Sequence, residues 1–405
     1  MKQHRSFPAV TVTKKARRAL QQRHPWVYAG EITGQDEIED GTLCDVLSES
    51  GTYLGTGFYN HHSLIRVRIV STNANDRFDE AFWRRRIRYS LQYRRLVMPE
   101  QLDCCRLIFG EADHFPGWTV DRFGTILVSQ IVSLGIEKIK GMLFDILLDE
   151  LKAMGETVEG IYERNDIALR RKEGLSEQTG WAAGLPHPQA TTTQIVENGI
   201  RYQVDFAQGQ KTGFFLDQKE NRRAAARLAA GRHVLDCCTH TGSFALNAAR
   251  AGAASVMAAD ISATALDNAR LNAELNGLQD RIEFVHSDVF ELLEKLRTQP
   301  HAIDYLILDP PAFTKSRRTL HNAAQGYLRL NTLALRLLPR GGLFASASCS
   351  HFMKDDLFEA MLVEASRQAG VQLRQIEVRH QAPDHPILPE VPETQYLKFY
   401  LFQVI

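Results

Sequence analysis

Four aspartates stand at the ends of apolar runs in the second half of this 405-residue chain. Each run has the length and composition of a buried strand, and helical segments separate the runs, so a parallel sheet is expected. The carboxyl ends of parallel strands meet at one edge, where α/β proteins bind nucleotides. A carboxylate at that edge can accept hydrogen bonds from ribose hydroxyls. The four residues are Asp236, Asp260, Asp288 and Asp309.

A cysteine follows the next predicted strand of this series. Cys349 stands between Ser348 and Ser350, directly after the predicted strand Leu343–Ser348. A cysteine reaches its thiolate form near neutral pH, and the thiolate can form a covalent bond with a substrate carbon. A packing role is the alternative, because free cysteine is among the most buried residue types. The expected position opposite Asp309 favours a nucleophile.

The segment Val234–Phe244 predicts the end of a strand, a tight turn and the start of a helix. Gly242 permits a backbone conformation that a Cβ would obstruct. Cys238 and His240 occupy positions at which the usual nucleotide-binding turn has glycine, so an ordinary turn between strand and helix is the alternative. Asp260 follows Asp236 by 260 − 236 = 24 residues, which leaves room for one helix and one strand before a ribose-binding carboxylate.

The four acidic strand ends and the run Asp309–Phe313 together resemble the class I S-adenosylmethionine-dependent methyltransferases, over about Arg201 to Ile405. The resemblance implies an α/β fold, with a C-terminal Rossmann-like domain built on a mostly parallel seven-stranded sheet, and S-adenosyl-L-methionine as the cofactor. It also implies that Asp260 holds the ribose and that Asp288 accepts a hydrogen bond from the adenine amine. The cofactor-binding residues that it implies are Thr212, Phe214, Asp217, Asp236, Thr241, Gly242, Asp260, Asp288 and Asp309.

Short strands punctuated by glycines predict a small β-barrel in residues 1–74. The run Arg23–Ile32 opens this barrel, and its part Pro25–Ile32 resembles a PUA domain, which is an RNA-binding module. Basic residues that lie beside the barrel would contact the substrate RNA. They are Lys14, Lys15 and Arg17. A solvated surface without RNA is the alternative for this charge cluster.

Residues 75–198 are predicted to form an α+β middle domain between the barrel and a catalytic domain at 199–405. Apolar residues at helical spacing predict an arginine-rich helix at Phe78–Val97 and an amphipathic helix at Ile136–Met154, with strands at Asp103–Ile131 between them. We expect this domain to join the RNA-binding module to the catalytic unit. A spacer without a further role is the alternative.

Motifs from three parts of the chain, Pro25–Ile32, Thr212–Gln218 and Asp309–Phe313, together with Cys349 resemble the RlmI-type bacterial 23S rRNA cytosine-C5 methyltransferases. The resemblance implies formation of 5-methylcytosine through an adduct between Cys349 and C6 of a cytosine that is single-stranded or flipped out of a helix. Asp309 would hold the Watson–Crick edge of the base. The wall of the base pocket would come from Pro310, Pro311 and Phe313. Many RNA cytosine-C5 enzymes have a second cysteine after the strand-four proline, where this chain has Ala312.

Two other functions are consistent with the same residues. The run Asp309–Phe313 also resembles the motif with which exocyclic N-methyltransferases, including guanine N2 enzymes, bind a target amine, and that chemistry needs no thiol. The second alternative is a non-catalytic RNA-binding factor of ribosome assembly that retains a relic cofactor fold. Cofactor binding without transfer to any RNA would indicate this alternative.

The composition narrows the class of protein. The 48 basic and 48 acidic residues give zero formal net charge, so the non-specific affinity for nucleic acid should be modest. The six cysteines show no Cys-x-x-Cys metal spacing, and the N-terminal residues have no apolar core of a signal peptide. We therefore expect a reduced, cytoplasmic protein without a metal or membrane partner. Its expected partner is RNA, as 23S rRNA or as a pre-50S particle, and a homodimer is one option for its assembly.

Overall fold

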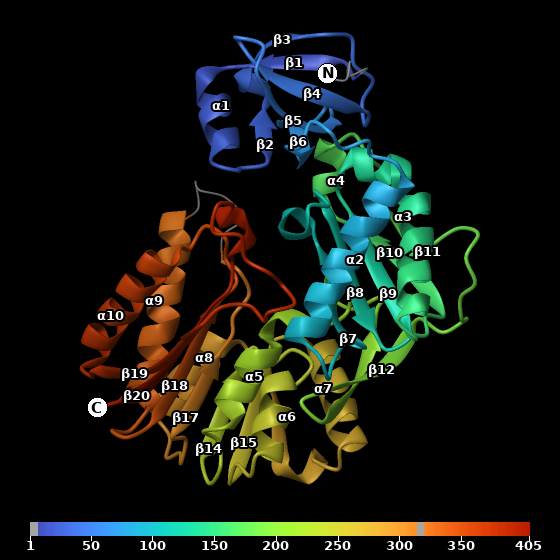
Figure 1. Cartoon of the computed structure of the whole chain (residues 1–405). Coiled ribbons are helices and arrows are strands. Elements are labelled where there is room, and N and C mark those ends of the chain that lie inside the picture. The colour runs from blue at the N-terminus through green and yellow to red at the C-terminus, as the bar shows by residue number, and fades with distance from the viewer. Residues whose placement is uncertain (1–6, 314–319) are drawn as a thin grey trace. The chain divides into compact units, whose positions relative to one another are not determined.

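The computed structural model describes residues 7–313 and 320–405, and in it the chain forms two compact units. The first unit holds the chain up to Ile195 together with Val204–Leu216 and Pro383–Thr394. The second unit holds Val196–Gln203, Asp217–Ala382 and Gln395–Ile405. The expected α/β architecture is confirmed: a small β-rich part comes first in the sequence, and a mostly parallel seven-stranded sheet comes last (Figure 1). The domain boundaries at 74 and 198 stay predictions.

The N-terminal part of the first unit is a six-stranded sheet in the order β2-β6-β5-β4-β1-β3. Its apolar side chains pack around Val10, Val12 and Val67. Helix α1 (Lys14–Gln21) follows β1, and the hydroxyl of Thr13 accepts a hydrogen bond from the Ala16 N–H at its start. The strands are β1 (Ala9–Val12), β2 (Trp26–Tyr28), β3 (Ile32–Gln35), β4 (Leu43–Ser48), β5 (Tyr53–Tyr59) and β6 (Ile65–Ser71).

This sheet begins earlier than the sequence predicted. We expected Arg23–Ile32 to open it, but β1 and α1 precede that run. Strand β1 has only four residues and pairs in parallel with β4 and antiparallel with β3. Its strand conformation therefore depends on partners that are distant in sequence, and this is why its local pattern was a weak signal.

The rest of the first unit is built on a five-stranded sheet in the order β11-β10-β9-β8-β7. Helix α2 (Glu80–Val97) and helix α3 (Leu134–Ala153) share one apolar core with this sheet, as the two amphipathic patterns predicted. A short helix, α4 (Leu169–Lys172), precedes β11. The strands are β7 (Cys104–Phe109), β8 (Trp118–Phe123), β9 (Ile126–Ile131), β10 (Gly160–Asn165) and β11 (Gln178–Trp181). Outside this sheet, β12 (Thr192–Glu197) and β13 (Ile200–Asp205) pair with each other, and their residues are divided between the two units.

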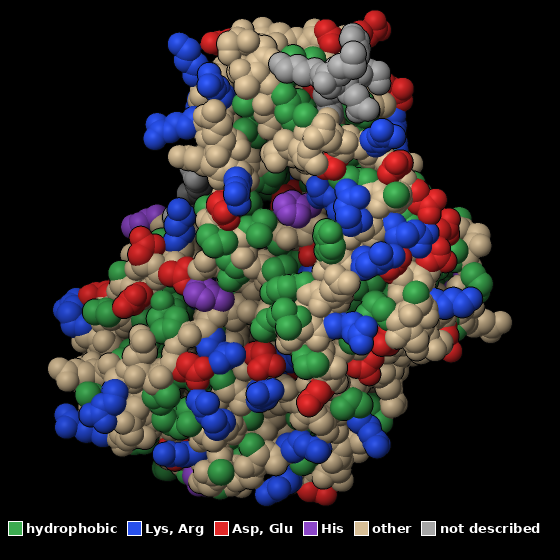
Figure 2. Space-filling view, in the orientation of Figure 1, with side chains coloured by type: hydrophobic (Ala, Val, Ile, Leu, Met, Phe, Trp, Pro, Cys, Tyr) green, Lys and Arg blue, Asp and Glu red, His purple; other side chains and the backbone are tan. Residues whose placement is uncertain are grey.

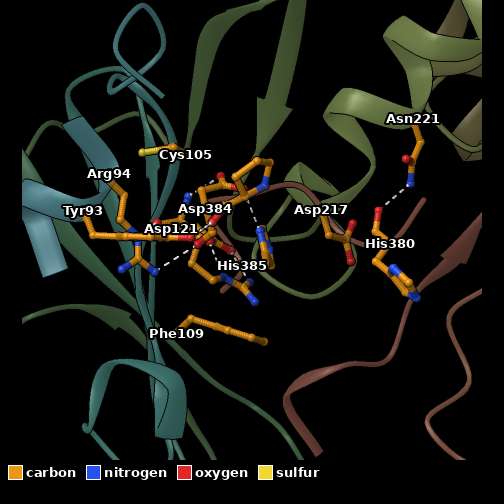
Figure 3. Close-up of polar contacts among 12 residues, drawn as sticks. Tyr93, Arg94, Cys105, Phe109, Asp121, Asp217, Asn221, His380, Asp384 and His385 are labelled. Carbon is orange, nitrogen blue, oxygen red and sulfur yellow. Dashed lines mark hydrogen bonds and ion pairs between the residues drawn. The ribbon is translucent and has the colours of Figure 1, made fainter. Parts of the chain in front are cut away.

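The segment Pro383–Thr394 belongs to the first unit through buried polar contacts near β7. Arg94 on α2 donates to the backbone oxygen of Asp384 at 2.9 Å, and the Asp384 carboxylate accepts from the Arg106 N–H at 2.9 Å. Figure 3 shows Arg94 and Asp384 beside Tyr93, whose hydroxyl donates to the Pro383 backbone oxygen at 3.0 Å. These contacts satisfy the polar groups of a segment that has no strand or α-helix of its own.

The second unit contains a seven-stranded sheet in the order β16-β15-β14-β17-β18-β20-β19. Strands β14 to β18 are parallel to one another, and β20 and β19 form an antiparallel pair at the end of the chain. The strand order reverses between β14 and β17, which is the place where such sheets bind ligands. The strands are β14 (His233–Cys237), β15 (Ser255–Asp260), β16 (Ile282–His286), β17 (Tyr305–Leu308), β18 (Leu343–Ser348), β19 (Leu373–Arg379) and β20 (Lys398–Val404).

Helices cover both faces of this sheet (Figure 1). One group packs its leucines and phenylalanines into a core with the strands, and consists of α8 (Val289–Arg297), α9 (Leu320–Leu337) and α10 (Asp355–Ala369). The other group consists of α5 (Lys219–Ala226), α6 (Ser243–Arg250) and α7 (Ala263–Leu275). Within the described residues, no helix is both long enough and apolar enough to span a membrane.

Candidate active site

The four acidic strand ends gather around the turn that follows β14. Burial raises the pKa of the Cys238 thiol, and the carboxylates of all four aspartates raise it further, so all four lie near this side chain. Asp260 ends β15 and Asp309 directly follows β17, which are the two neighbours of β14 in the sheet. The expectation that the four carboxylates share one edge is therefore met.

The turn between β14 and α6 has an alternating left-handed backbone. The φ angles are 60° at Cys238, 51° at His240 and 78° at Gly242. A Cβ at Gly242 would lie 3.0 Å from the Cβ of Ala269 on α7, so both the conformation and the close packing require glycine there. Cys238 and His240 adopt the conformation that glycine usually supplies, although a side chain makes it less favourable.

Asp236 is fully buried at the start of this turn. Its Oδ2 accepts hydrogen bonds from the Thr239 hydroxyl at 2.5 Å and from the Ala245 N–H at 2.9 Å. Burial raises the pKa of Asp236 to about 7, although these two hydrogen bonds act in the opposite direction. Its Oδ1 is buried and has no hydrogen-bond partner among the described residues. A buried acceptor without a donor is unfavourable, and a ligand with a donor or a positive charge would relieve it.

Asp260 and Asp288 also hold the protein backbone. Asp260 accepts hydrogen bonds from the N–H groups of His240 at 2.8 Å and Ser262 at 2.9 Å, and so ties the β14 turn to the β15 end. Asp288 is the N-cap residue just before α8, and its carboxylate accepts from the Phe290 N–H at 2.8 Å. A carboxylate has about four acceptor sites, so both residues keep capacity for a ligand. The sequence predicted only the ligand roles.

A cation with several hydrogen-bond donors fits this edge. Four carboxylates lie at this edge of the sheet, and repulsion from neighbouring carboxylates further raises the pKa of Asp236. S-adenosyl-L-methionine carries a sulfonium, an ammonium group and ribose hydroxyls. Its positive charge and its hydrogen-bond donors match the Oδ1 of Asp236, which has no partner among the described residues, and the remaining acceptor sites of Asp260 and Asp288. Thr241 and Gly242 lie in the same turn, and Thr241 is buried.

Asp309 is held by residues at the start of α5. Gln218 Nε2 donates to Asp309 Oδ2 at 3.0 Å, and Asn221 Nδ2 donates to Gln218 Oε1 at 2.7 Å. Asn221 Nδ2 also donates to the backbone oxygen of His380 at 3.1 Å, as Figure 3 shows. The sequence did not assign roles to Gln218 and Asn221. The sequence feature that could have indicated these two residues is a pair of amide side chains, three residues apart, after a glycine-flanked loop. Both side chains are buried in the structure.

Cys349 directly follows β18 and is partly exposed. The neighbouring Ser348 hydroxyl donates to Tyr327 Oη on α9 at 3.1 Å. At the residue after Cys349, the backbone oxygen of Ser350 accepts a hydrogen bond from Lys398 Nζ at 2.6 Å. Because β17 and β18 are parallel neighbours, Cys349 and Asp309 leave the sheet at the same edge. Sequence reasoning missed Lys398 and Tyr327, since neither lies in a recognisable motif.

The predicted base-binding residues follow Asp309. Pro310 is buried and Pro311 is exposed. The ring centroids of Phe313 and Tyr327 are 4.5 Å apart, and the ring planes meet at 42°. The wall and stacking roles of these three residues stay predictions.

Two of the predicted cofactor residues, Thr212 and Phe214, belong to the first unit. The Thr212 hydroxyl donates to Asp121 at 2.6 Å, and Asp121 forms a buried ion pair with Arg106 at 2.7 Å. Phe214 is buried, so both residues have structural contacts of their own. Asp217 is a buried residue of the second unit, and its Oδ2 accepts from the Tyr396 hydroxyl at 2.6 Å. The cofactor roles of these three residues stay predictions.

The basic residues predicted to contact RNA lie on α1. Lys14 and Lys15 are exposed, and Arg17 is half-buried. Lys15 pairs with Glu31 at 3.0 Å, which leaves Lys14 and Arg17 better placed for phosphates. Figure 2 shows basic side chains over this part of the first unit. Across the described part of the chain, no group of three or more histidine, cysteine or acidic residues is arranged to hold a metal ion.

The fold and the acidic edge agree with the comparisons to known proteins. Residues 163–403 match the family described as S-adenosylmethionine-dependent methyltransferases, and residues 10–72 match a PUA-like domain. The chain therefore belongs to the S-adenosylmethionine-dependent methyltransferases, and S-adenosyl-L-methionine is its cofactor, as the sequence predicted.

Curated relatives match along nearly the whole chain. A protein of Klebsiella pneumoniae (strain 342) named ribosomal RNA large subunit methyltransferase I is 37% identical over 402 residues, which cover 98% of this chain and 99% of the relative. A protein of the same name from Shewanella denitrificans is 40% identical over 387 residues, which cover 94% of this chain and 95% of the relative. The predicted resemblance to this group of methyltransferases is confirmed.

Solved structures agree with the fold. A structure from Streptococcus mutans, described as a SAM-dependent methyltransferase, superposes with a TM-score of 0.82 at 20% identity, over 98% of this chain and all of the other. A second structure, a methyltransferase complexed with SAH, gives a TM-score of 0.83 at 20% identity, with the same coverage of both chains. At this identity the likeness concerns the fold.

Proposed function

We propose that this protein methylates C5 of a cytosine in the RNA of the large ribosomal subunit, with Cys349 as the covalent nucleophile. The name of the relatives supports ribosomal RNA as the substrate, since they match over nearly the full length. One observation carries the reaction type: a partly exposed thiol follows β18 at the same edge of the sheet at which Asp309 follows the neighbouring strand β17. This pairing of a nucleophile with a carboxylate is what C5 chemistry on a pyrimidine requires.

The reaction proceeds in three steps. The Cys349 thiolate adds to C6 of the cytosine, and Asp309 holds the Watson–Crick edge while N3 takes a proton. C5 then has enamine character and takes the methyl group, for which S-adenosyl-L-methionine is the donor. Finally the C5 proton is lost to a base, the C5–C6 double bond re-forms, the thiolate leaves, and N3 gives back the proton that it took in the first step. The thiolate is regenerated, and the C5 proton is the one proton released for each methyl group transferred.

The second cysteine of many RNA cytosine-C5 enzymes is absent from this scheme. Its place after Pro311 is taken by Ala312. Abstraction of the C5 proton and release of Cys349 from C6 must therefore proceed without a second thiol.

The test uses RNA in which cytosines at candidate sites are replaced by 5-fluorocytosine. Fluorine at C5 prevents the final proton loss, so the protein should stay covalently attached to the RNA in denaturant. The adduct should vanish in Cys349→Ala and persist in Cys44→Ala, which removes a buried thiol of the first unit. Circular dichroism and cofactor binding would show that both variants fold.

Other outcomes separate the alternatives. Methyl transfer to ordinary RNA without an adduct would overturn the C5 mechanism and favour an exocyclic amine as the acceptor, because that chemistry needs no thiol. Cofactor binding without transfer to any RNA would instead favour a non-catalytic RNA-binding factor.

A further inference from the structure

Lys398 is a buried lysine beside the proposed nucleophile. It begins β20, and its Cα is the antiparallel register partner of Ser348, the residue before Cys349. Only 2% of the residue is exposed to solvent. Lysine is almost never fully buried unless it is paired, so its position calls for a compensating interaction.

The ammonium group of Lys398 has neutral partners. Its Nζ donates to the backbone oxygens of Ser350 at 2.6 Å and Tyr396 at 2.7 Å. An ammonium carries three N–H donors, so one donor has no acceptor in the part of the chain that the structure describes. Within the same part, no carboxylate lies within 4.0 Å of this nitrogen. The two carbonyl contacts hold the group in place, but they do not neutralise its charge.

The charges around this lysine point to Cys349. Burial lowers the pKa of Lys398 to about 8, whereas Asp355 and Cys349 act to raise it. The Asp355 carboxylate is already occupied by His380 at 2.8 Å and by Gln395 at 2.9 Å. A negative charge on Cys349 would compensate the buried ammonium, and the ammonium would in turn favour the thiolate.

We propose that Lys398 is a positioning residue that stabilises the thiolate of Cys349 and fixes the following backbone through Ser350. The inference rests on the proposed role of Cys349 as the nucleophile. Other described titratable groups lie in this region: Asp355 at the start of α10 with its partner His380, Tyr327 on α9 and Asp309 after β17. Asp355 and Asp309 are carboxylates that disfavour a thiolate, and the ammonium group of Lys398 acts against them.

The test measures the thiolate of Cys349 directly in the full-length protein without RNA. The rate of iodoacetamide alkylation at Cys349 is followed by mass spectrometry over a range of pH, because only the thiolate reacts. Lys398→Gln removes the charge but keeps a donor for the Ser350 oxygen, and Lys398→Met removes both. Lys398→Arg keeps the charge. The matched control is Lys354→Gln, an exposed lysine four residues beyond Ser350.

In Lys398→Gln we expect the midpoint of the alkylation curve to move to higher pH and the rate near pH 7 to fall about tenfold, which corresponds to one pKa unit. Lys398→Arg and Lys354→Gln should keep the wild-type midpoint. A purely structural role of Lys398 would lower cofactor binding or thermal stability without moving the midpoint. An unchanged midpoint in a folded Lys398→Gln protein would overturn the inference.

Adduct formation with 5-fluorocytosine RNA separates this inference from the proposed function. If wild type forms the adduct, Lys398→Gln should form it more slowly, and raising the pH should restore the rate. If wild type forms no adduct, the proposed C5 mechanism fails, whereas the alkylation midpoints still decide whether Lys398 controls the thiol. If Lys398→Gln does not fold, Lys398→Arg provides the test. A shifted pH midpoint of Cys349 alkylation in this variant, which keeps the positive charge, would count against stabilisation of the thiolate by that charge.

Discussion

Gln218 Nε2 donates a hydrogen bond of 3.0 Å to Oδ2 of Asp309. The donor lies just before α5 and the acceptor just after β17, so two distant segments meet at the proposed base-binding carboxylate. Asn221 fixes the Gln218 amide in turn, at 2.7 Å. The orientation of Asp309 is thus set by a chain of two amide side chains, from Asn221 to Gln218 to Asp309, which we call the amide relay. It does not depend on the strand of Asp309 alone.

Replacing Gln218 by leucine should therefore slow methyl transfer. A hydrogen bond to a charged group contributes about 1.5–3 kcal/mol, so the transfer rate should fall about ten- to a hundredfold while cofactor affinity changes little. Single-turnover transfer to RNA and calorimetry with cofactor measure the two quantities. Gln279→Leu, at an exposed position, is the control. A wild-type transfer rate in Gln218→Leu would contradict a role for the relay.

Asp260→Ala should weaken cofactor binding. The substitution removes the acceptors predicted to bind the ribose hydroxyls, and it also frees the His240 N–H that the carboxylate now holds at 2.8 Å. The expected loss is about 2–3 kcal/mol of binding free energy. Isothermal titration calorimetry measures it, with Asp267→Ala as the control, because Asp267 is an exposed acid on α7 that pairs only with Arg270 at 2.9 Å among the described residues. Equal affinities in both variants would argue against the ribose assignment.

The affinity for cofactor should depend on pH through Asp236. Its pKa is raised to about 7 by burial, so below that pH the free protein holds a neutral carboxylic acid. A positively charged ligand favours the ionised form, so affinity should rise as the pH rises through about 7 and then level off.

Calorimetry with S-adenosylmethionine between about pH 6 and pH 8 tests this dependence in wild type and in Asp236→Asn. The amino group of the cofactor titrates in both proteins, so the difference between the two curves reports Asp236. Parallel curves would show that this carboxylate does not change its protonation on binding.

Reversing charges on α1 should weaken RNA binding without affecting the cofactor. Lys14→Glu and Arg17→Glu change two residues of a helix whose other face is buried through Ala16 and Leu20. Each lost phosphate contact should lower the slope of log affinity against log salt by about 0.7–0.9. Fluorescence anisotropy over a salt series measures the slope, and Lys295→Glu on α8 is the control. A double variant with the wild-type slope would exclude α1 from the RNA-binding surface.

The sequence by itself determined the order of the elements and the chemistry at the strand ends. The apolar runs that precede Asp236, Asp260 and Asp309 and the helical periodicity of Ile136–Met154 are local patterns, and a local pattern can be recognised in a single sequence. The resemblance that these motifs carry implied the mostly parallel seven-stranded sheet, which the structure confirms. The start of the first sheet did not, because the four residues of β1 become a strand only by pairing with β3 and β4.

Only the tertiary structure decided which side chains surround the reactive groups. The antiparallel register of β18 and β20 brings Lys398 to the residue beside Cys349, and the packing of α5 brings Gln218 to Asp309. The tertiary structure also gives the carboxylates of Asp260 and Asp288 backbone N–H groups as hydrogen-bond partners, in addition to any ligand. Such contacts join residues that are far apart in sequence. Their burial fixes the side-chain positions, because an interior polar group without a hydrogen bond raises the free energy of the folded state. A strand pattern predicts where a carboxylate stands, whereas its neighbours and its pKa depend on the register and packing of the whole sheet.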